Sequence, residues 1–477
     1  MTPSPTNSKS PLVWRQTFSS WWPLAASWLL MGIEIPMISA IVARMGNAEG
    51  QLAAFGGVVF PLALLIEAPV IMMLTASTAL CSDQDRIRTL RRFMMWLAAG
   101  LTLLHLLIVV TPLWEIIVSD ILDVPAIARP PARLAFLVML PWTWAIADRR
   151  FHQGLLIRAN QSNLVGLGTA IRLLFTASVL LIGYSYNFVE GAVLGGSALS
   201  LGVIAEAVFA RIASRQALSK APAKAAQETC GSCQYIIVEP KPEECPECGS
   251  HLAEVGLVRG ESSPAMNLSR LLAFYVPLAL TPLVVMVAQP LGSAGMSRMP
   301  LALASLAAWP ALNGLVFMVR SLGVAMTEVV VNQWGRPNAH RVLGQFTYMV
   351  AIATTVIVVV VGYTPLTAGW FRYLNHLDGQ LADVAEQALR LTPVLVWLSV
   401  WTALYQGILV NHHRTRGVTE AVIVMLVLTT ATLAVGVWMN SVTGISVAII
   451  AFTVGAIGQT AWLRIRAAPF ITQARQE

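Results

Sequence analysis

Four of the five cysteines form two closely spaced pairs that could hold a metal ion. Cys230 and Cys233 make one C-x-x-C pair, and Cys245 and Cys248 make the second, within the polar stretch CGSCQYIIVEPKPEECPECG. Two such pairs can place four thiolates around one tetrahedral zinc ion. The pattern therefore predicts a structural Zn site, a zinc knuckle over residues 230–251 with one ion per chain. A disulfide pairing and a dithiol redox role are the alternative interpretations.

Four ionisable side chains lie inside long apolar stretches, where a charge is costly unless it is paired or faces water. They are Glu34, Glu67, Arg172 and Arg320. Glu34 is the candidate proton site, because it stands near Pro36, which should bend its helix. Arg320 is a candidate site for a substrate anion, and Arg172 is a further candidate whose partner the sequence does not identify. The alternative interpretation is a set of ion pairs that only hold helices together.

The elements that carry these residues are predicted to be membrane-spanning helices. The chain has 477 residues, of which 56% are hydrophobic and only 12% are charged, with a mean hydropathy of +0.68. This composition is typical of a polytopic membrane protein. Twelve apolar stretches approach the roughly 20 residues that a spanning helix needs. They are residues 21–43, 52–80, 93–114, 132–147, 164–183, 188–210, 268–291, 301–331, 342–361, 388–409, 418–438 and 442–463.

The fourth stretch is the weakest of the twelve, because Pro141 interrupts it and charged residues follow residue 147 at once. Lysine and arginine are enriched in cytoplasmic connections of membrane proteins. Placing both termini and the linker in the cytoplasm puts most loop arginines inside. These are Arg86, Arg88, Arg91, Arg92, Arg149, Arg150, Arg158, Arg336, Arg341, Arg414 and Arg416. We therefore expect a multi-pass protein of the cell membrane (inner or plasma membrane), and the net charge of +7 follows from its topology.

The two halves of the chain resemble each other. Pro23 aligns with Pro277 and Arg44 with Arg298 at an offset of 254 positions, and Gln153-Gly154 aligns with Gln406-Gly407 at an offset of 253. Because each half carries six predicted helices, both halves enter the membrane from the same side. Nearly the same offset makes Glu67 and Arg320 approximate equivalents. They are expected to face each other across a central cavity, as a gate or with a substrate anion in place of the carboxylate.

The expected fold class is an all-α polytopic membrane protein with two parallel six-helix bundles and a small zinc-ribbon-like insert between them. The cytoplasmic tail covers residues 1–18 and the first bundle covers 19–212. A cytoplasmic linker with the knuckle covers 213–265, the second bundle covers 266–466, and a cytoplasmic tail covers 467–477. Two bundles that face each other around a central cavity have the geometry of a secondary transporter.

At the level of motifs, LAAFGGVVFPLALL and LASLAAWPALNGLVF resemble the multidrug/oligosaccharidyl-lipid/polysaccharide exporter superfamily, which includes the MATE transporters. RLAFLVMLPWTWAIADRRFHQGLLIRANQSNLVG and AMTEVVVNQWGRP are most similar to its progressive ankylosis branch. The resemblance implies an exporter or antiporter of an organic solute, in that branch an organic anion, by alternating access. Cation-coupled MATE proteins keep acids in both halves, whereas the repeat equivalent of Glu34 is Ala288. Sodium coupling through the second half is therefore not expected, and H+ is the candidate coupling ion.

Two other classes of function stay open. A major-facilitator-type transporter also has two six-helix halves, and an intramembrane lipid- or sugar-transferring enzyme is a more distant alternative. The sequence has no G-x-x-x-x-G-K-[ST], H-E-x-x-H or G-x-S-x-G signature, so we expect no enzymatic activity. The expected partners are the lipid bilayer and a small organic solute. Nucleic acid is not expected, because acidic residues outnumber basic ones in the linker, and a monomer is favoured.

Overall fold

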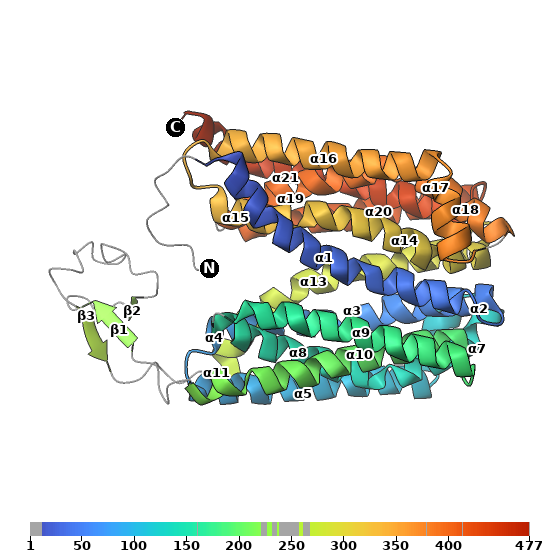
Figure 1. The fold of residues 1–477 in the computed structure, drawn as a ribbon, viewed down its shortest axis with the longest axis horizontal. Helices are drawn as coiled ribbons and strands as arrows, with labels where there is room; N and C mark the ends of the chain where they lie inside the picture. The colour runs from blue at the N-terminus through green and yellow to red at the C-terminus, as the bar shows by residue number, and fades with distance from the viewer. Residues whose placement is uncertain are drawn as a thin grey trace.

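The computed structural model describes residues 12–159, 161–220, 227–230, 236–237, 257–260, 268–377, 379–412 and 414–476. These residues form a bundle of long helices and one small sheet (Figure 1). Helices suit an apolar chain in a bilayer, because each helix satisfies its own backbone hydrogen bonds. Among the described residues, eleven helices are long and apolar enough to cross a membrane. The all-α membrane fold is confirmed, with one candidate span fewer than expected.

The helices of the first half run from α1 to α11. They are α1 (Trp14–Val42), α2 (Ala48–Leu52), η2 (Ala53–Val59), α3 (Phe60–Ile71), α4 (Met73–Leu80), α5 (Gln84–Val110), α6 (Leu113–Glu115), η3 (Ile116–Ile121), η4 (Ala126–Ala128), α7 (Arg129–Val138), α8 (Leu140–Arg158), α9 (Ser162–Tyr186), α10 (Gly191–Ala213) and α11 (Arg215–Lys220). From α2 to α4 the chain forms one continuous candidate span, Ala48–Leu80.

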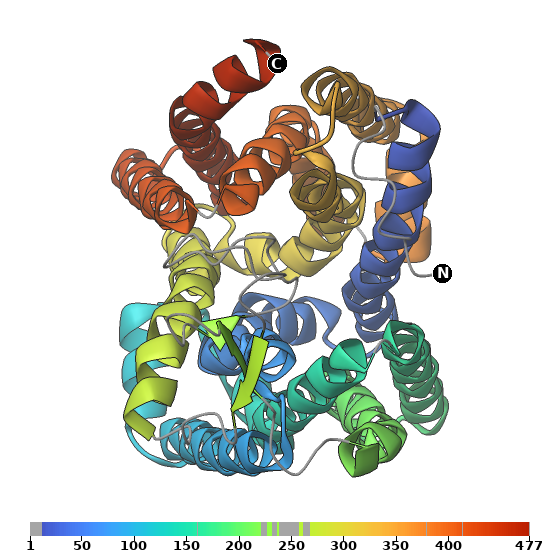
Figure 2. The same ribbon diagram turned by 90° about the vertical axis from the view of Figure 1, so that its left-hand side faces the viewer.

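The helices of the second half follow the same order. They are α13 (Leu268–Ser297), α14 (Ala302–Val324), α15 (Met326–Gln333), α16 (Ala339–Tyr363), α17 (Leu366–Ala368), η5 (Gly369–Leu374), α18 (Gly379–Leu389), α19 (Pro393–Asn411), α20 (Thr415–Met439) and α21 (Gly444–Gln476). In Figure 2, α14 to α21 gather on one side of the bundle and α3 to α10 on the other, with α1 and α13 between them.

The two halves repeat each other element by element. An offset of 253 positions carries both ends of α9 onto those of α20, and both ends of the π-helix η3 onto those of η5. The residue after each of α9 and α20 is an asparagine in the left-handed conformation, Asn187 with φ 48° and Asn440 with φ 45°. Asparagine tolerates this conformation better than most residues do. The internal repeat expected from the sequence is therefore confirmed.

The fourth expected span differs from the sequence expectation. Residues 132–147 belong to two helices, α7 and α8, and α8 continues to Arg158. Asp148 and Arg149 are each only 5% exposed, so they lie inside the bundle and not in a cytoplasmic connection. A buried charge is tolerated where it finds a partner, and α10, which packs against α8, supplies Glu206 and Arg211 as partners. The same charges explain why α8 does not count among the eleven apolar spans.

The outer limits of the helical domains also differ from the expected tails. α1 begins at Trp14, within the expected tail 1–18, and α21 continues to Gln476, through most of the expected tail 467–477. Leu12, just before α1, is buried and donates its backbone N–H to the carbonyl of Pro337. These contacts with the second half hold the first turns of α1 in a helix.

The linker contributes a three-stranded antiparallel sheet. The strands are β1 (Gln227–Cys230), β2 (Ile236–Ile237) and β3 (Leu257–Gly260), in the order β2-β1-β3. Cys230 is therefore the last residue of the central strand, opposite Leu257. The other three predicted zinc ligands, Cys233, Cys245 and Cys248, lie outside the described residues.

Candidate functional site

The first half contains a buried network of charged and amide groups centred on Glu206 of α10. Arg149 on α8 donates a hydrogen bond to Glu206 Oε2 over 2.5 Å, and Gln153, one turn further, donates to Oε1 over 2.9 Å. Arg172 on α9 approaches the same carboxylate, with Nη1 3.7 Å from Oε2. Glu206 is fully buried. A carboxylate can remain charged there only because two guanidinium groups and an amide replace its water.

Glu34 extends this network to the helix that opens the chain. Its carboxylate lies 3.4 Å from Arg172 Nη2 and accepts a hydrogen bond over 3.2 Å from the hydroxyl of Thr176. Arg172 thus bridges Glu34 on α1 and Glu206 on α10. The structure brings together two of the four sequence-predicted site residues, Glu34 and Arg172, and identifies the partners of Arg172.

A second ionic group lies beside the first, again on α8 and α10. Asp148 accepts two hydrogen bonds from Arg211, over 2.6 and 3.1 Å. His152 stands one turn after Asp148, with its Nδ1 3.5 Å from the carboxylate and 2.8 Å from the Asp148 carbonyl oxygen. Asp148 therefore links α8 to α10 through Arg211, and His152 contacts Asp148 from the next turn of α8. This pairing explains why its polar face can be buried.

Glu67 on α3 is buried without such a partner. Glu67 is only 5% exposed, and its Oε2 atom makes no hydrogen bond with any described group. The charges that act on it are the guanidinium groups of Arg149, Arg150 and Arg172. Glu67 therefore experiences the positive charge of the first-half network without forming an ion pair with it.

Arg320 on α14 is isolated in the second half. It is half-buried, its Nε is unbonded, and the described residues give it no ion pair. Neither Glu67 nor Arg320 is among the charges that act on the other, so the two do not pair in this conformation. The residues aligned by the repeat are thus a buried carboxylate and a guanidinium, neither of which forms an ion pair with a described residue.

Neutral groups replace the charged pair in the second half. The repeat equivalents of Arg149 and Glu206 are Thr402 and Gln459, and the hydroxyl of Thr402 lies 2.8 Å from that of Thr460, the residue after Gln459. The side-chain contact between the two helices is kept, but its charges are not. The electrostatic character of the bundle is therefore asymmetric, although its backbone is nearly symmetric.

Each half begins with a helix that reaches into the other half. Trp21 on α1 donates its indole N–H to the Leu322 carbonyl of α14 over 2.9 Å, and Tyr275 on α13 donates its hydroxyl to the Pro69 carbonyl of α3 over 2.6 Å. Trp21 is equivalent to Tyr275 under the repeat, and Pro69 to Leu322. The two bonds are therefore related by the pseudo-two-fold axis.

A second symmetric pair of contacts joins the halves at the opposite end of α1 and α13. Arg44 donates to the carbonyls of Tyr373 and Leu374 over 2.9 and 2.8 Å. Arg298 donates to the carbonyls of Asp120 and Ile121 over 3.1 and 2.7 Å. We call these four bonds the arginine latch. It lies at the end of the bundle that carries α2 and α18, away from the end of α21 (Figure 1).

Two repeat-related helical bundles joined by their first helices define a class of polytopic membrane protein, and solved structures show which fold it is. At 15% identity the chain is similar to the inward-facing conformation of a multidrug resistance MATE family transporter of the MOP superfamily, with a TM-score of 0.65 over 96% of this chain and 99% of that one. It is also similar to the outward-facing conformation of a multidrug resistance MATE family transporter of the MOP superfamily, at 16% identity and with a TM-score of 0.58 over 98% of this chain and 100% of that one. The fold is therefore that of the MATE transporters.

A further solved structure shares the fold. A MOP superfamily transporter from Pyrococcus furiosus, whose binding pocket is described as having reverse polarity, is 16% identical, with a TM-score of 0.60 over 96% of this chain and 99% of that chain. No protein-family model matches the sequence, and the comparison with curated proteins finds no match either. The progressive ankylosis branch is thus not supported by these comparisons, and the likeness concerns the fold.

Sequence reasoning missed two central members of the network, Arg149 and Glu206. Glu206 lies inside the expected span 188–210, so the rule that singled out Glu34 would also have found it. Arg149 was assigned to a connection, because the apolar stretch before it ends at residue 147. Among the described residues, no group of three or more potential ligands could hold a metal ion, and three of the four predicted zinc ligands are outside that set.

Proposed function

We propose that the protein is a secondary active transporter that exports a small organic solute by alternating access. The observation that carries this proposal is the pair of repeat-related halves, joined by symmetric contacts at both ends of α1 and α13. Rocking one half against the other would break the contacts at one end and expose a central site to either side in turn. The shared fold with MATE transporters supports this class over a major-facilitator transporter or an intramembrane enzyme.

The solute that we propose is an organic anion. Arg320 has no ion pair among the described residues, and the carboxylate of Glu67 likewise forms none, while Arg149 and Arg172 are paired with Glu206 and Glu34. A charge inside a membrane bundle requires a partner or a watery path. A substrate anion on Arg320 would supply that partner. When the halves rock, Glu67 would approach Arg320 and take the place of the departing anion.

The coupling ion that we propose is a proton, bound at Glu34. Its carboxylate is held by one guanidinium at 3.4 Å and one hydroxyl at 3.2 Å, and the guanidinium also serves Glu206. Protonation of Glu34 would release Arg172 toward Glu206 and loosen the contact between α1 and α9. The equivalent position in the second half is Ala288, so the second half has no matching carboxylate.

Reconstituted protein tests these proposals. Efflux of labelled anionic and cationic solutes from proteoliposomes is measured with and without a pH gradient, for Glu34→Gln, Glu67→Gln and Arg320→Ala. We expect anion export that Arg320→Ala abolishes and a pH dependence that Glu34→Gln removes. Arg133→Ala is the matched control, because Arg133 pairs with the exposed Glu115 at 3.9 Å and donates to the Val109 carbonyl, and none of its printed contacts is with the buried network. Undiminished export with unchanged pH dependence in all three variants would reject the site.

We also propose that the linker binds one structural zinc ion through Cys230, Cys233, Cys245 and Cys248. Cys230 closes the central strand of an antiparallel sheet, and the next cysteine follows before β2 begins. A C-x-x-C pair that begins at the end of one strand and precedes its paired neighbour in the sequence suits a tetrahedral thiolate site. Four thiolates would hold the ion and fold a linker too small to bury its own core.

Metal analysis tests the zinc proposal. We expect one zinc per chain by plasma mass spectrometry, with the zinc lost in Cys230→Ser and retained in Cys81→Ser. Cys81 is buried between α4 and α5 and is the matched control. Disulfide-bonded cysteines in freshly lysed cells, without stoichiometric zinc, would contradict it.

The remaining proposals concern placement and assembly. We propose a multi-pass protein of the cell membrane with both termini and the linker in the cytoplasm, acting as a monomer, because one chain supplies both halves. Labelling of introduced cysteines from outside the cell should reach positions near Gly46 or Asn375 and miss the linker. The opposite sidedness would overturn the orientation.

A further inference from the structure

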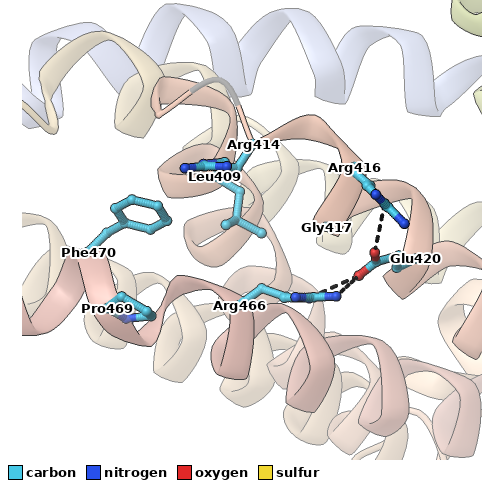
Figure 3. Close-up of a pocket in the computed structure, with 8 residues that line it drawn as sticks. All are labelled: Leu409, Arg414, Arg416, Gly417, Glu420, Arg466, Pro469 and Phe470. Carbon is cyan, nitrogen blue, oxygen red and sulfur yellow. Dashed lines mark hydrogen bonds and ion pairs between the residues drawn. The ribbon is translucent and has the colours of Figure 1, made fainter.

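The second half contains a pocket that the transport site does not use. It is a cavity of about 680 Å³ at the junction of the end of α19, the start of α20 and the last third of α21 (Figure 3). Its lining includes Leu409, Arg414, Arg416, Glu420, Arg466 and Phe470. Three arginines and one glutamate thus line this pocket together with an aromatic ring.

The charges of this pocket are only partly balanced. Glu420 accepts two hydrogen bonds from Arg466, over 2.5 and 2.9 Å, and lies 3.3 Å from Arg416 (Figure 3). Arg414 forms no ion pair with the described residues. One carboxylate therefore orients two guanidinium groups while the pocket keeps an excess of two positive charges.

The repeat shows that the fold does not require these charges. The equivalent positions of Arg414, Arg416, Glu420 and Arg466 in the first half are Gln161, Asn163, Leu167 and Ala213. α9 and α10 nevertheless pack against each other as α20 and α21 do. Helix packing alone therefore does not account for the four charged residues of this pocket.

The walls of the pocket differ in polarity. Phe470, Pro469 and Leu409 form an apolar side, and the guanidinium of Arg466 lies 5.4 Å from the ring centre of Trp462. Tryptophan is enriched where helices leave the hydrocarbon core, and basic pockets between spanning helices bind anionic head groups there. We propose that this pocket binds a phosphate-bearing anion, either an anionic phospholipid head group or a soluble organophosphate.

In this site the phosphate oxygens accept hydrogen bonds from Arg414 and Arg416, because both guanidinium groups have free donors. Arg466 keeps its hydrogen bonds to Glu420 and forms part of the pocket wall. The glycerol carbons or the first acyl methylenes of the ligand contact Phe470 and Leu409. The inference does not rest on the transport proposal, since it concerns binding at a separate place in the second half.

Binding to the full-length protein in detergent tests the inference by native mass spectrometry. The probes are phosphatidylglycerol and phosphatidylcholine at equal concentrations and, separately, glycerol 3-phosphate. The test variant is Arg414→Gln/Arg416→Gln, and the control is Arg88→Gln/Arg92→Gln, which removes two exposed arginines at the start of α5. Loss of two surface cations should weaken binding of the anion about thirtyfold.

Comparison of phosphatidylglycerol with glycerol 3-phosphate identifies the source of the phosphate. A loss confined to phosphatidylglycerol supports a lipid head group, whereas a loss for glycerol 3-phosphate that displaces lipid supports a soluble organophosphate. Equal affinity of the test and control variants for both probes would overturn the site. Equal binding of phosphatidylcholine and phosphatidylglycerol, unaffected by the variants, would also overturn it. Thermal unfolding of each variant shows whether it is folded.

Discussion

The arginine latch offers the sharpest test of alternating access. Arg44 and Arg298 hold carbonyls of η5 and η3 in the opposite half, and these bonds must break before that end of the bundle can open. Arg44→Ala/Arg298→Ala removes all four bonds. We expect the double variant to favour the conformation in which the latch end is open.

The size of the effect follows from the geometry. A hydrogen bond from a charged donor contributes about 1.5–3 kcal/mol in a buried setting, and exposed pairs contribute about 1 kcal/mol or less. Both arginines are half-buried and also bond within their own helices, so we assign about 1 kcal/mol to each latch arm. Removing both arms changes the ratio of the two conformations by about thirtyfold.

Hydrogen–deuterium exchange of the reconstituted protein measures the shift. In the double variant, amides of residues 116–121 and 369–374 should exchange faster, and those of α4 and α15 at the opposite end should exchange more slowly. The opposite signs distinguish rocking of the halves from local fraying. The control is Arg129→Ala, which removes a 2.7 Å bond to the Val124 carbonyl within the first half.

The reasoning would be refuted by faster exchange at the latch end with no change at α4 and α15. It would also be refuted if Arg129→Ala produced the same paired change. Each single variant should give about the square root of the double effect, because the two arms are related by symmetry and lie apart.

Three further predictions concern packing and reactivity. Glu206→Gln should destabilise the protein by about 3–5 kcal/mol in thermal unfolding, because it removes the carboxylate that pairs with the buried Arg149. Thr402→Val should cost only about 1 kcal/mol, and equal losses would contradict the electrostatic asymmetry of the two halves. Gly154→Ala should destabilise by about 1–3 kcal/mol, since a Cβ there would lie 2.6 Å from the Leu74 carbonyl oxygen, while Gly166→Ala, with open space around it, should not. Burial raises the pKa of Cys81 to about 12, so its thiolate is scarce at pH 8, and maleimide should leave it unmodified in folded protein but react after denaturation; rapid labelling of the folded protein would contradict this.

Long apolar stretches in the sequence predicted the class of fold and most of its membrane-spanning helices. A membrane imposes about 20 apolar residues on each spanning helix, so eleven of twelve stretches could be recognised from composition alone. The repeat was also visible, because residues such as Arg44 and Arg298 occupy special positions at the ends of the first helices. What the sequence did not predict was that these arginines bind across to the opposite half.

For the candidate site, the sequence identified some of the charged residues but not the partners of those residues. Glu34 and Arg172 could be singled out because a charge in an apolar stretch is conspicuous, but which charge meets which depends on helix packing. Arg149 lay beyond the apolar part of its stretch, and only the contacts of α8 with α10 show that its charge is buried against Glu206. The charged groups of this network find their partners on other helices, at sequence separations from 34 positions for Arg172 and Glu206 to 138 for Arg172 and Glu34.

The sequence by itself thus determined what local chemistry determines: the apolar spans, the repeat and the paired cysteines. Tertiary structure decided the extent of α8, the pairing of Arg172 with two carboxylates, and the separation of Glu67 from Arg320. The physical reason is that transfer of an apolar segment to lipid depends on its own composition. The cost of a buried charge, in contrast, depends on groups that only packing brings near it.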